Sequence, residues 1–157
     1  MINLTIKTLL PCELPLLTKQ LFKYIDIDNM IKENAERMKN GEINIFGMFK
    51  GSHLIGELRV KYESEDEREA IPGKRVYLYA FRLLKKYRGK GYGKYLLQEV
   101  ISKLYAEGYS EFTVGVEDDN ERAIHIYKDF GFDNRIARKY EEYEGYGYEY
   151  NLYLKTM

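Results

Sequence analysis

A short basic segment that is rich in glycine, KKYRGKGYGK at positions 85–94, constrains the fold of this chain more than any other feature. A predicted strand, Arg75 to Leu84, leads into it, and a predicted amphipathic helix, Tyr95 to Tyr105, follows it. Glycines let backbone N–H groups approach a phosphate, and the start of a helix adds partial positive charge. The cations of the segment are Lys85, Lys86, Arg88, Lys90 and Lys94. The sequence therefore predicts a strand–turn–helix unit that binds phosphate groups.

Two common phosphate-binding motifs do not fit the spacing of these glycines. A Walker A loop requires a glycine five positions before the Gly93–Lys94 pair, but Arg88 stands there. Tyr95 also replaces the serine or threonine that binds magnesium in that loop. A dinucleotide fingerprint needs G-x-G-x-x-G, and counting from Gly89 the third glycine is replaced by lysine. The spacing excludes both motifs.

The spacing Arg88-x-x-Gly91-x-Gly93 resembles the pyrophosphate-binding motif of the GNAT superfamily of N-acetyltransferases. Farther along the chain, NERAIHIYKDFGF at positions 120–132 resembles the second half of that family's cofactor site. The matching positions in this second motif are Asn120, Ala123, Tyr127, Gly131 and Phe132. Two motifs in the right order are much more specific than one. The resemblance is specific over residues 77–132, and the order of the elements extends it over the whole chain.

The resemblance implies that acetyl-CoA is the acyl donor, and it names the residues that would bind it. The main chain at Phe81, Leu83 and Leu84 would contact the acetyl carbonyl and the pantetheine arm, which lies like an added strand. The pyrophosphate would be held by the backbone N–H groups of the turn, namely Arg88, Gly89, Lys90, Gly91, Tyr92, Gly93 and Lys94. Asn120 would hydrogen-bond the arm, and Tyr127 would protonate the leaving thiolate as general acid. From the residues alone, Asn120 also fits a helix N-cap and Tyr127 a core aromatic residue.

Acetyl transfer to an amine also requires a neutral nucleophile, and the base that would produce it is less clear. Many members of the family place a glutamate on the fourth strand, at a position that holds Tyr77 in this chain. A tyrosine with an ordinary pKa of about 10 is a poor base at neutral pH. Glu57, on the preceding strand, is the candidate general base, acting directly or through water. The alternative is that Glu57, Arg59 and Lys61 are polar residues on a solvated strand face.

Apolar periodicity and turn residues predict one α/β (α+β) domain over residues 1–157, and the resemblance implies a GNAT-like fold for it. We expect a mixed, mostly antiparallel sheet of seven strands, flanked by about four helices. The expected strands are 4–8, 43–49, 54–62, 75–84, 112–116, 132–140 and 146–154, the last two joined by the turn EEYEG. The expected helices are two within 13–39, with a break near 26–29, one at 95–105, and one that ends at residue 130.

Composition and charge exclude several classes of protein. Lysine plus arginine equals 25 and aspartate plus glutamate equals 25, so no bulk attraction to nucleic acid is implied. Cys12 is the only cysteine, so neither an internal disulfide nor a thiolate metal site is expected. The N-terminus lacks the features of a secretion signal, and no apolar run is long enough to cross a bilayer. We therefore expect a cytoplasmic protein without a structural metal, a nucleic-acid partner or a membrane partner; the resemblance leaves a homodimer open.

The acceptor amine is not specified by the sequence. The acidic loop Glu63–Glu69 and the tyrosine-rich segment 139–155 place carboxylates and rings where members of the family build the acceptor cleft. Such a lining suits a cation, such as a small basic amine, a lysine or a protein N-terminus. The alternation of Tyr146, Tyr148, Tyr150, Leu152 and Leu154 along one strand face favours core packing instead. The alternative to an enzyme is a non-catalytic module that binds acetyl-CoA and regulates a partner.

Overall fold

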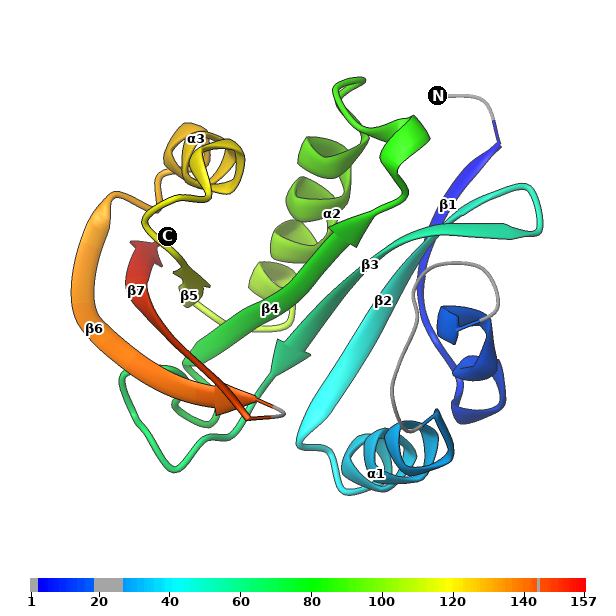
Figure 1. Ribbon diagram of the computed structural model, residues 1–157, viewed down its shortest axis with the longest axis horizontal. Helices are drawn as coiled ribbons and strands as arrows, with labels where there is room; N and C mark the ends of the chain where they lie inside the picture. The colour runs from blue at the N-terminus through cyan, green and yellow to red at the C-terminus, as the bar shows by residue number, and fades with distance from the viewer. Residues whose placement is uncertain (1–2, 19–26, 144) are drawn as a thin grey trace.

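A seven-stranded sheet, with strand order β1-β2-β3-β4-β5-β7-β6, organises the molecule (Figure 1). The computed structural model describes residues 3–18, 27–143 and 145–157. The strands are β1 (Leu4–Thr8), β2 (Ile43–Lys50), β3 (His53–Lys61), β4 (Arg75–Leu83), β5 (Glu111–Val116), β6 (Asn134–Tyr143) and β7 (Tyr146–Thr156). Among the strand pairs of the described residues, only β4–β5 is parallel. The predicted mixed, mostly antiparallel sheet is confirmed.

Three α-helices lie wholly within the described residues, where about four helices were expected: α1 (Ile27–Lys39), α2 (Tyr92–Ala106) and α3 (Glu121–Asp129). Two short 3-10 helices are η1 (Pro11–Glu13) and η3 (Lys85–Tyr87). Residues 15–18 are also helical and belong to the first helix expected within 13–39, whose remainder falls on residues 19–26, outside the described residues. The predicted break was wrong for 27–29, which belong to α1. Within the described ranges, no helix combines the length and the apolar character needed to cross a membrane.

Helix α2 begins at Tyr92, three residues before the predicted start at Tyr95, because the preceding glycine can cap it. Gly91 is the N-cap and has a φ of 86°, a left-handed conformation that a glycine adopts without the steric cost of a β-carbon. At the other end, Gly108 has a φ of 109°, as expected for the residue that terminates a helix. The glycines therefore fix both ends of α2.

The two faces of the sheet are covered differently, and this difference decides where a ligand can enter. Helices α2 and α3 cover one face with a continuous apolar core that includes Leu78, Leu97, Val100 and Phe132. On the other face, Leu14 and Leu17, which follow η1, and residues of α1 pack against β2 and β3 in a smaller cluster. Figure 1 shows α2 and α3 on one side of the molecule and α1 on the opposite side.

The final hairpin is longer than predicted, because side chains expected in its turn pair across the strands. The turn EEYEG was placed between the strands, but β6 continues through Glu141 and Glu142. Glu141 lies opposite Tyr148, whose hydroxyl donates a hydrogen bond to its carboxylate at 2.9 Å. Cross-strand pairs of this kind stabilise a sheet, so the strands extend almost to Gly145.

Candidate functional site

The glycine-rich turn between β4 and α2 presents a run of unpartnered backbone N–H groups. Gly89 and Gly91 both have positive φ values, 75° and 86°. Among the described residues, none of the N–H groups from Gly89 to Lys94 donates to another part of the chain. The N–H group of Arg88, just before this run, does donate a hydrogen bond, to the Lys85 carbonyl. No side chain caps α2, so the first N–H groups of this helix are available to a ligand.

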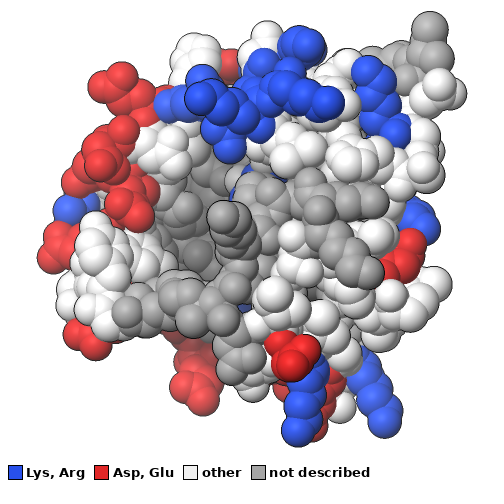
Figure 2. All heavy atoms as spheres, turned by 45° about the vertical axis from the view of Figure 1, so that its right-hand side comes forward, with Lys and Arg blue, Asp and Glu red and all other residues white. Residues whose placement is uncertain are grey.

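Positive charge surrounds this run of N–H groups. Figure 2 shows lysines and arginines gathered at the top of the molecule, the end where Figure 1 shows the turn into α2. The Nε atom of Arg88 donates to the Leu83 carbonyl at 3.0 Å, which ties the turn to the end of β4. Lys94 pairs with Asp129 at 3.0 Å and links the start of α2 to α3. A helix N-terminus with free amides and flanking cations suits a multiply charged anion.

Strands β4 and β5 separate at the carboxyl end of the sheet and form a fork beside this turn. Their parallel ladder ends at the pair Leu78–Val114, although β4 continues to Leu83 and β5 to Val116. β5 pairs with β7 along its other edge, so beyond this pair the facing edges of β4 and β5 are both open. An open backbone edge can accept an extended ligand as an added strand.

A bulge in β4 turns Phe81 toward α2 and α3. Ala80 has a φ of 49°, and two residues of β4, Ala80 and Phe81, lie opposite the single residue between Glu57 and Arg59 on β3. The Phe81 ring consequently lies 6.2 Å from the Tyr127 ring. A β-carbon added at Gly93 would lie 3.5 Å from the Phe81 ring. The bulge therefore brings the fork, the glycine-rich turn and α3 together around one aromatic side chain.

The predicted ligand residues on α3 also have structural roles. Asn120 is the N-cap of the helix, and its Oδ1 accepts the Ala123 N–H at 3.2 Å. Tyr127 is 6% exposed and packs edge-on against Phe132 at 5.8 Å. Burial raises the pKa of the Tyr127 phenol above its ordinary value. The N-cap and core interpretations are thus confirmed, while contacts of these two residues with a ligand stay predictions.

Leu84, the third backbone position predicted on β4, has no free main-chain group. Its N–H donates to the Ile55 carbonyl at 2.9 Å, and its carbonyl accepts the Tyr87 N–H at 2.9 Å. The Leu84 N–H is therefore not available to a ligand. Phe81 and Leu83 remain the backbone candidates.

Glu57 is fully buried, so the alternative that placed it on a solvated face was wrong. It is 0% exposed and Arg59 is 6% exposed. Arg59 Nε lies 2.7 Å from Glu57 Oε1, and Arg82 Nε lies 3.9 Å from Glu57 Oε2. In the described part of the chain, Glu57 Oε2 and the Tyr79 hydroxyl are the two buried side-chain atoms without a hydrogen bond. The role of Glu57 as general base stays a prediction.

Comparison with known proteins agrees with this geometry. The sequence profile of the acetyltransferase (GNAT) family matches residues 10–132. The chain belongs to this family. It is 34% identical over 59 residues to the thialysine N-epsilon-acetyltransferase of Mus musculus, a match that covers 38% of this chain and 35% of that protein. The chain thus matches about a third of the length of that relative.

Solved structures of this GNAT protein's relatives confirm the fold. An N-acetyltransferase from Staphylococcus aureus Mu50 superposes with a TM-score of 0.75 at 18% identity, covering 98% of both chains. A putative acetyltransferase from Salmonella typhimurium, solved with its cofactor acetyl-CoA, superposes with a TM-score of 0.71 at 17% identity, covering 98% of this chain and 94% of the other. The predicted family and fold class are confirmed.

A buried charged cluster, which the sequence patterns did not reveal, fixes the acidic loop of this GNAT protein. Lys139 Nζ on β6 lies 2.6 Å from Glu69 Oε2 and 2.8 Å from Asp66 Oδ2. The Thr113 hydroxyl on β5 donates to the Glu69 carbonyl at 2.6 Å. Burial alone would raise the pKa of Glu69, but hydrogen bonds from Lys139 and Ser64 outweigh it and leave that pKa lowered. The loop is therefore anchored to β5 and β6.

Replacing Lys139 with methionine is expected to lower the free energy of unfolding at pH 7 by about 2 kcal/mol, because Glu69 loses its buried partner. The folded-state pKa of Glu69 lies below its unfolded value, so this stabilisation is complete above the unfolded pKa. It is lost as the pH falls through the folded-state pKa. Urea unfolding at several pH values should show the difference shrinking below about pH 4.5. The exposed Lys128→Met control should change stability by less than about 0.5 kcal/mol at every pH.

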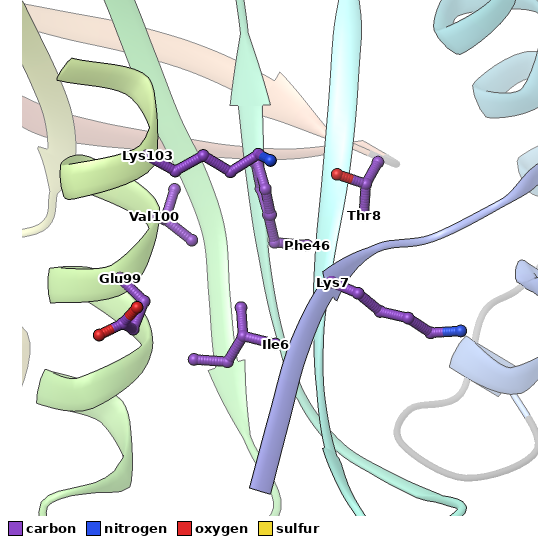
Figure 3. Close-up of a pocket in the computed structure, with 7 residues that line it drawn as sticks. All are labelled: Ile6, Lys7, Thr8, Phe46, Glu99, Val100 and Lys103. Carbon is purple, nitrogen blue, oxygen red and sulfur yellow. The ribbon is translucent and has the colours of Figure 1, made fainter. Parts of the chain in front are cut away.

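A separate pocket of about 120 Å³ lies between β1, β2 and α2 (Figure 3). Its lining residues are Ile6, Lys7, Thr8, Phe46, Glu99, Val100 and Lys103. Figure 3 shows the Lys7 side chain directed away from α2, so Glu99 and Lys103 supply the charges next to the helix. None of the predicted site residues lines this pocket, and it does not belong to the site at the fork.

Proposed function

We propose that this chain is an N-acetyltransferase that moves the acetyl group of acetyl-CoA to a primary amine by direct attack in a ternary complex. The observation that supports this most strongly is the run of unpartnered N–H groups from Gly89 to Lys94, beside the open edge of β4. Phe81 links the two features, because it lies near both Gly93 and Tyr127. One extended ligand with a phosphate end and a reactive end can bind the N–H groups of the turn and the open strand edge at the same time.

In this proposal the backbone of the chain does most of the binding. The amides of the turn hold the pyrophosphate, and the exposed lysines around them add Coulomb attraction. The open edge of β4 at Phe81 and Leu83 binds the extended arm. The Oδ1 of Asn120 caps α3, and its Nδ2 is the side-chain group that donates to that arm. Acetyl-CoA, when bound, supplies the thioester whose carbonyl the amine attacks.

Tyr127 is the proposed general acid of the reaction. Burial raises the pKa of its phenol, so the hydroxyl keeps its proton at neutral pH and has one to donate to a leaving thiolate. Glu57 is retained as the candidate base, although its carboxylate is buried and paired with Arg59. The acceptor is a primary amine, either a small basic molecule or a protein amine. The similar Mus musculus protein is a thialysine N-epsilon-acetyltransferase, a name that refers to an ε-amine, and this supports the class.

Acetyl-CoA at about one hundred times its Kd is expected to stabilise the protein by about 2.7 kcal/mol, because a ligand that binds only the folded state raises its stability. Thermal unfolding with acetyl-CoA, CoA and ATP measures this directly. Release of CoA during incubation with a panel of primary amines measures transfer. Stabilisation without transfer to any amine would favour the non-catalytic alternative, and stabilisation by ATP alone would overturn the proposal.

A further inference from the structure

Five tyrosine rings, which we call the tyrosine row, run across the sheet from β7 to β4: Tyr146, Tyr148, Tyr150, Tyr77 and Tyr79. On β7, the Tyr146 and Tyr148 rings are stacked at 6.3 Å, and the Tyr148 and Tyr150 rings are 5.9 Å apart. On β4, the Tyr77 and Tyr79 rings are stacked at 5.6 Å with an angle of 5° between their planes. These two groups of stacked rings form one continuous ligand surface only if they lie next to each other on the sheet.

Gly115 on β5 lets the two stacks meet. A β-carbon built at this residue would lie 2.7 Å from the Tyr150 ring and 2.9 Å from the Tyr77 hydroxyl. Both side chains therefore occupy the space that any larger residue would fill. Gly115 directly follows Val114, the last residue of β5 that pairs with β4, so the stacks meet at the fork.

The tyrosine row lies on the face of the sheet opposite α2 and α3. Val76 and Leu78, the neighbours of Tyr77, belong to the core under those helices, and alternate residues of a strand point to opposite faces. Core packing explains Tyr150, which is 3% exposed, but it was the wrong interpretation for Tyr146, which is 68% exposed. Tyr148 and Tyr77 are half-buried. The row therefore offers ring surface to a molecule that approaches the fork from this side.

Two carboxylates without a cation flank the outer part of the row. Glu141 on β6 lies opposite Tyr148 on β7 and accepts a hydrogen bond from its hydroxyl at 2.9 Å. Glu117 follows β5 on the same face as Gly115, and its charge acts on Tyr148. Within the described ranges neither carboxylate has an ion-pair partner. Glu69, at the inner end, is by contrast paired with Lys139 and with Lys61.

The raised pKa values of Tyr77 and Tyr148 keep these two phenols neutral at physiological pH. Burial, followed by the nearby Tyr150 and Glu69, raises the pKa of Tyr77. Burial and then the hydrogen bond to Glu141 raise the pKa of Tyr148. A neutral ring beside an uncompensated carboxylate attracts a cation through its face, and the carboxylate adds Coulomb attraction. An acceptor with a negative charge at this position would be repelled.

We propose that the tyrosine row binds the acceptor, and that Tyr148, with Glu117 and Glu141, holds a second positive charge on it, remote from the amine that is acetylated. The acceptor class is an unbranched aliphatic primary amine with a cationic group at its far end. The acceptor chain lies along the half-buried Tyr148 ring, and its near amine reaches the fork beside Tyr77 and Tyr150, which fill the space over Gly115. This inference rests on the proposed function, because it assigns the acceptor side of the same site.

Three acceptors of equal length test the inference: pentylamine, diaminopentane with a second terminal amine, and aminopentanoate with a terminal carboxylate. We expect kcat/KM for diaminopentane to exceed that for pentylamine about tenfold, with aminopentanoate the poorest acceptor. Glu141→Gln should reduce the advantage of diaminopentane to about twofold and leave pentylamine unchanged. Glutamine can still accept the Tyr148 hydrogen bond, so the hairpin stays intact. Tyr148→Leu should also reduce this advantage.

Glu142→Gln is the matched control, because Glu142 follows Glu141 and points to the opposite face of the sheet. There it accepts a hydrogen bond from the Tyr140 hydroxyl. This variant should leave all three values unchanged. Equal kcat/KM for diaminopentane and pentylamine, or a Glu141→Gln variant identical to wild type, would overturn the inference while acetyl transfer itself stands. A wild-type protein that binds acetyl-CoA but acetylates no amine would overturn the proposed function and the inference with it.

Discussion

Replacing Tyr127 with phenylalanine should lower kcat for acetyl transfer about a hundredfold while the Kd for acetyl-CoA stays within about twofold of wild type. The phenyl ring keeps the contacts with Phe81 and Phe132, so the core and the start of the fork are preserved. Only the hydroxyl that would protonate the leaving thiolate is lost. Steady-state kinetics with a good amine acceptor and thermal unfolding with acetyl-CoA measure the two quantities separately.

The pH dependence and a control variant make this test specific. Burial raises the pKa of Tyr127, so the protonated, active form persists as the pH rises. The wild-type kcat should therefore not decline between about pH 9 and about pH 11, where an exposed tyrosine ionises. Tyr105→Phe removes the hydroxyl of an exposed tyrosine on α2 and should leave kcat unchanged. A Tyr127→Phe enzyme with wild-type kcat would show that another group, or water, protonates the thiolate.

Replacing Gly91 with alanine is expected to weaken acetyl-CoA binding at least tenfold. Gly91 is the N-cap of α2 at a φ of 86°, and a β-carbon strains this left-handed conformation and shifts the turn. The N–H groups of the turn would then no longer converge on one phosphate group. Isothermal titration with acetyl-CoA, performed below the unfolding midpoint of the variant, measures the loss.

Gly108→Ala separates this effect from a general loss of stability. Gly108 follows the other end of the same helix, also has a positive φ, and likewise has open space around it. Both substitutions should cost about 1–2 kcal/mol of folding stability, because each places a side chain in a left-handed conformation. Only Gly91→Ala should weaken acetyl-CoA binding. Equal affinities in the two variants would mean that the turn does not bind the pyrophosphate.

The parts of the fold that the sequence predicted well depend on local chemistry. The glycine-rich turn, the end of α2 at Gly108 and the alternating strands follow from backbone conformation and from the period of apolar residues. Predictions failed where a distant partner decided the outcome. The final hairpin extended because Tyr148 pairs with Glu141, and Glu57 became buried together with Arg59. Neither partner can be identified from the alternation of polar residues in one strand.

Local sequence specifies the strand–turn–helix unit, because glycines that take positive φ values directly precede the amphipathic helix. What surrounds that unit depends on contacts between distant segments. The β4 bulge brings Phe81 to Tyr127, and Gly115 lets tyrosines from β4 and β7 meet at the fork. These contacts join residues far apart in the chain, and they form because strands β4, β5 and β7 are neighbours in the sheet. Strand order is a property of the whole packed core, which no local pattern encodes.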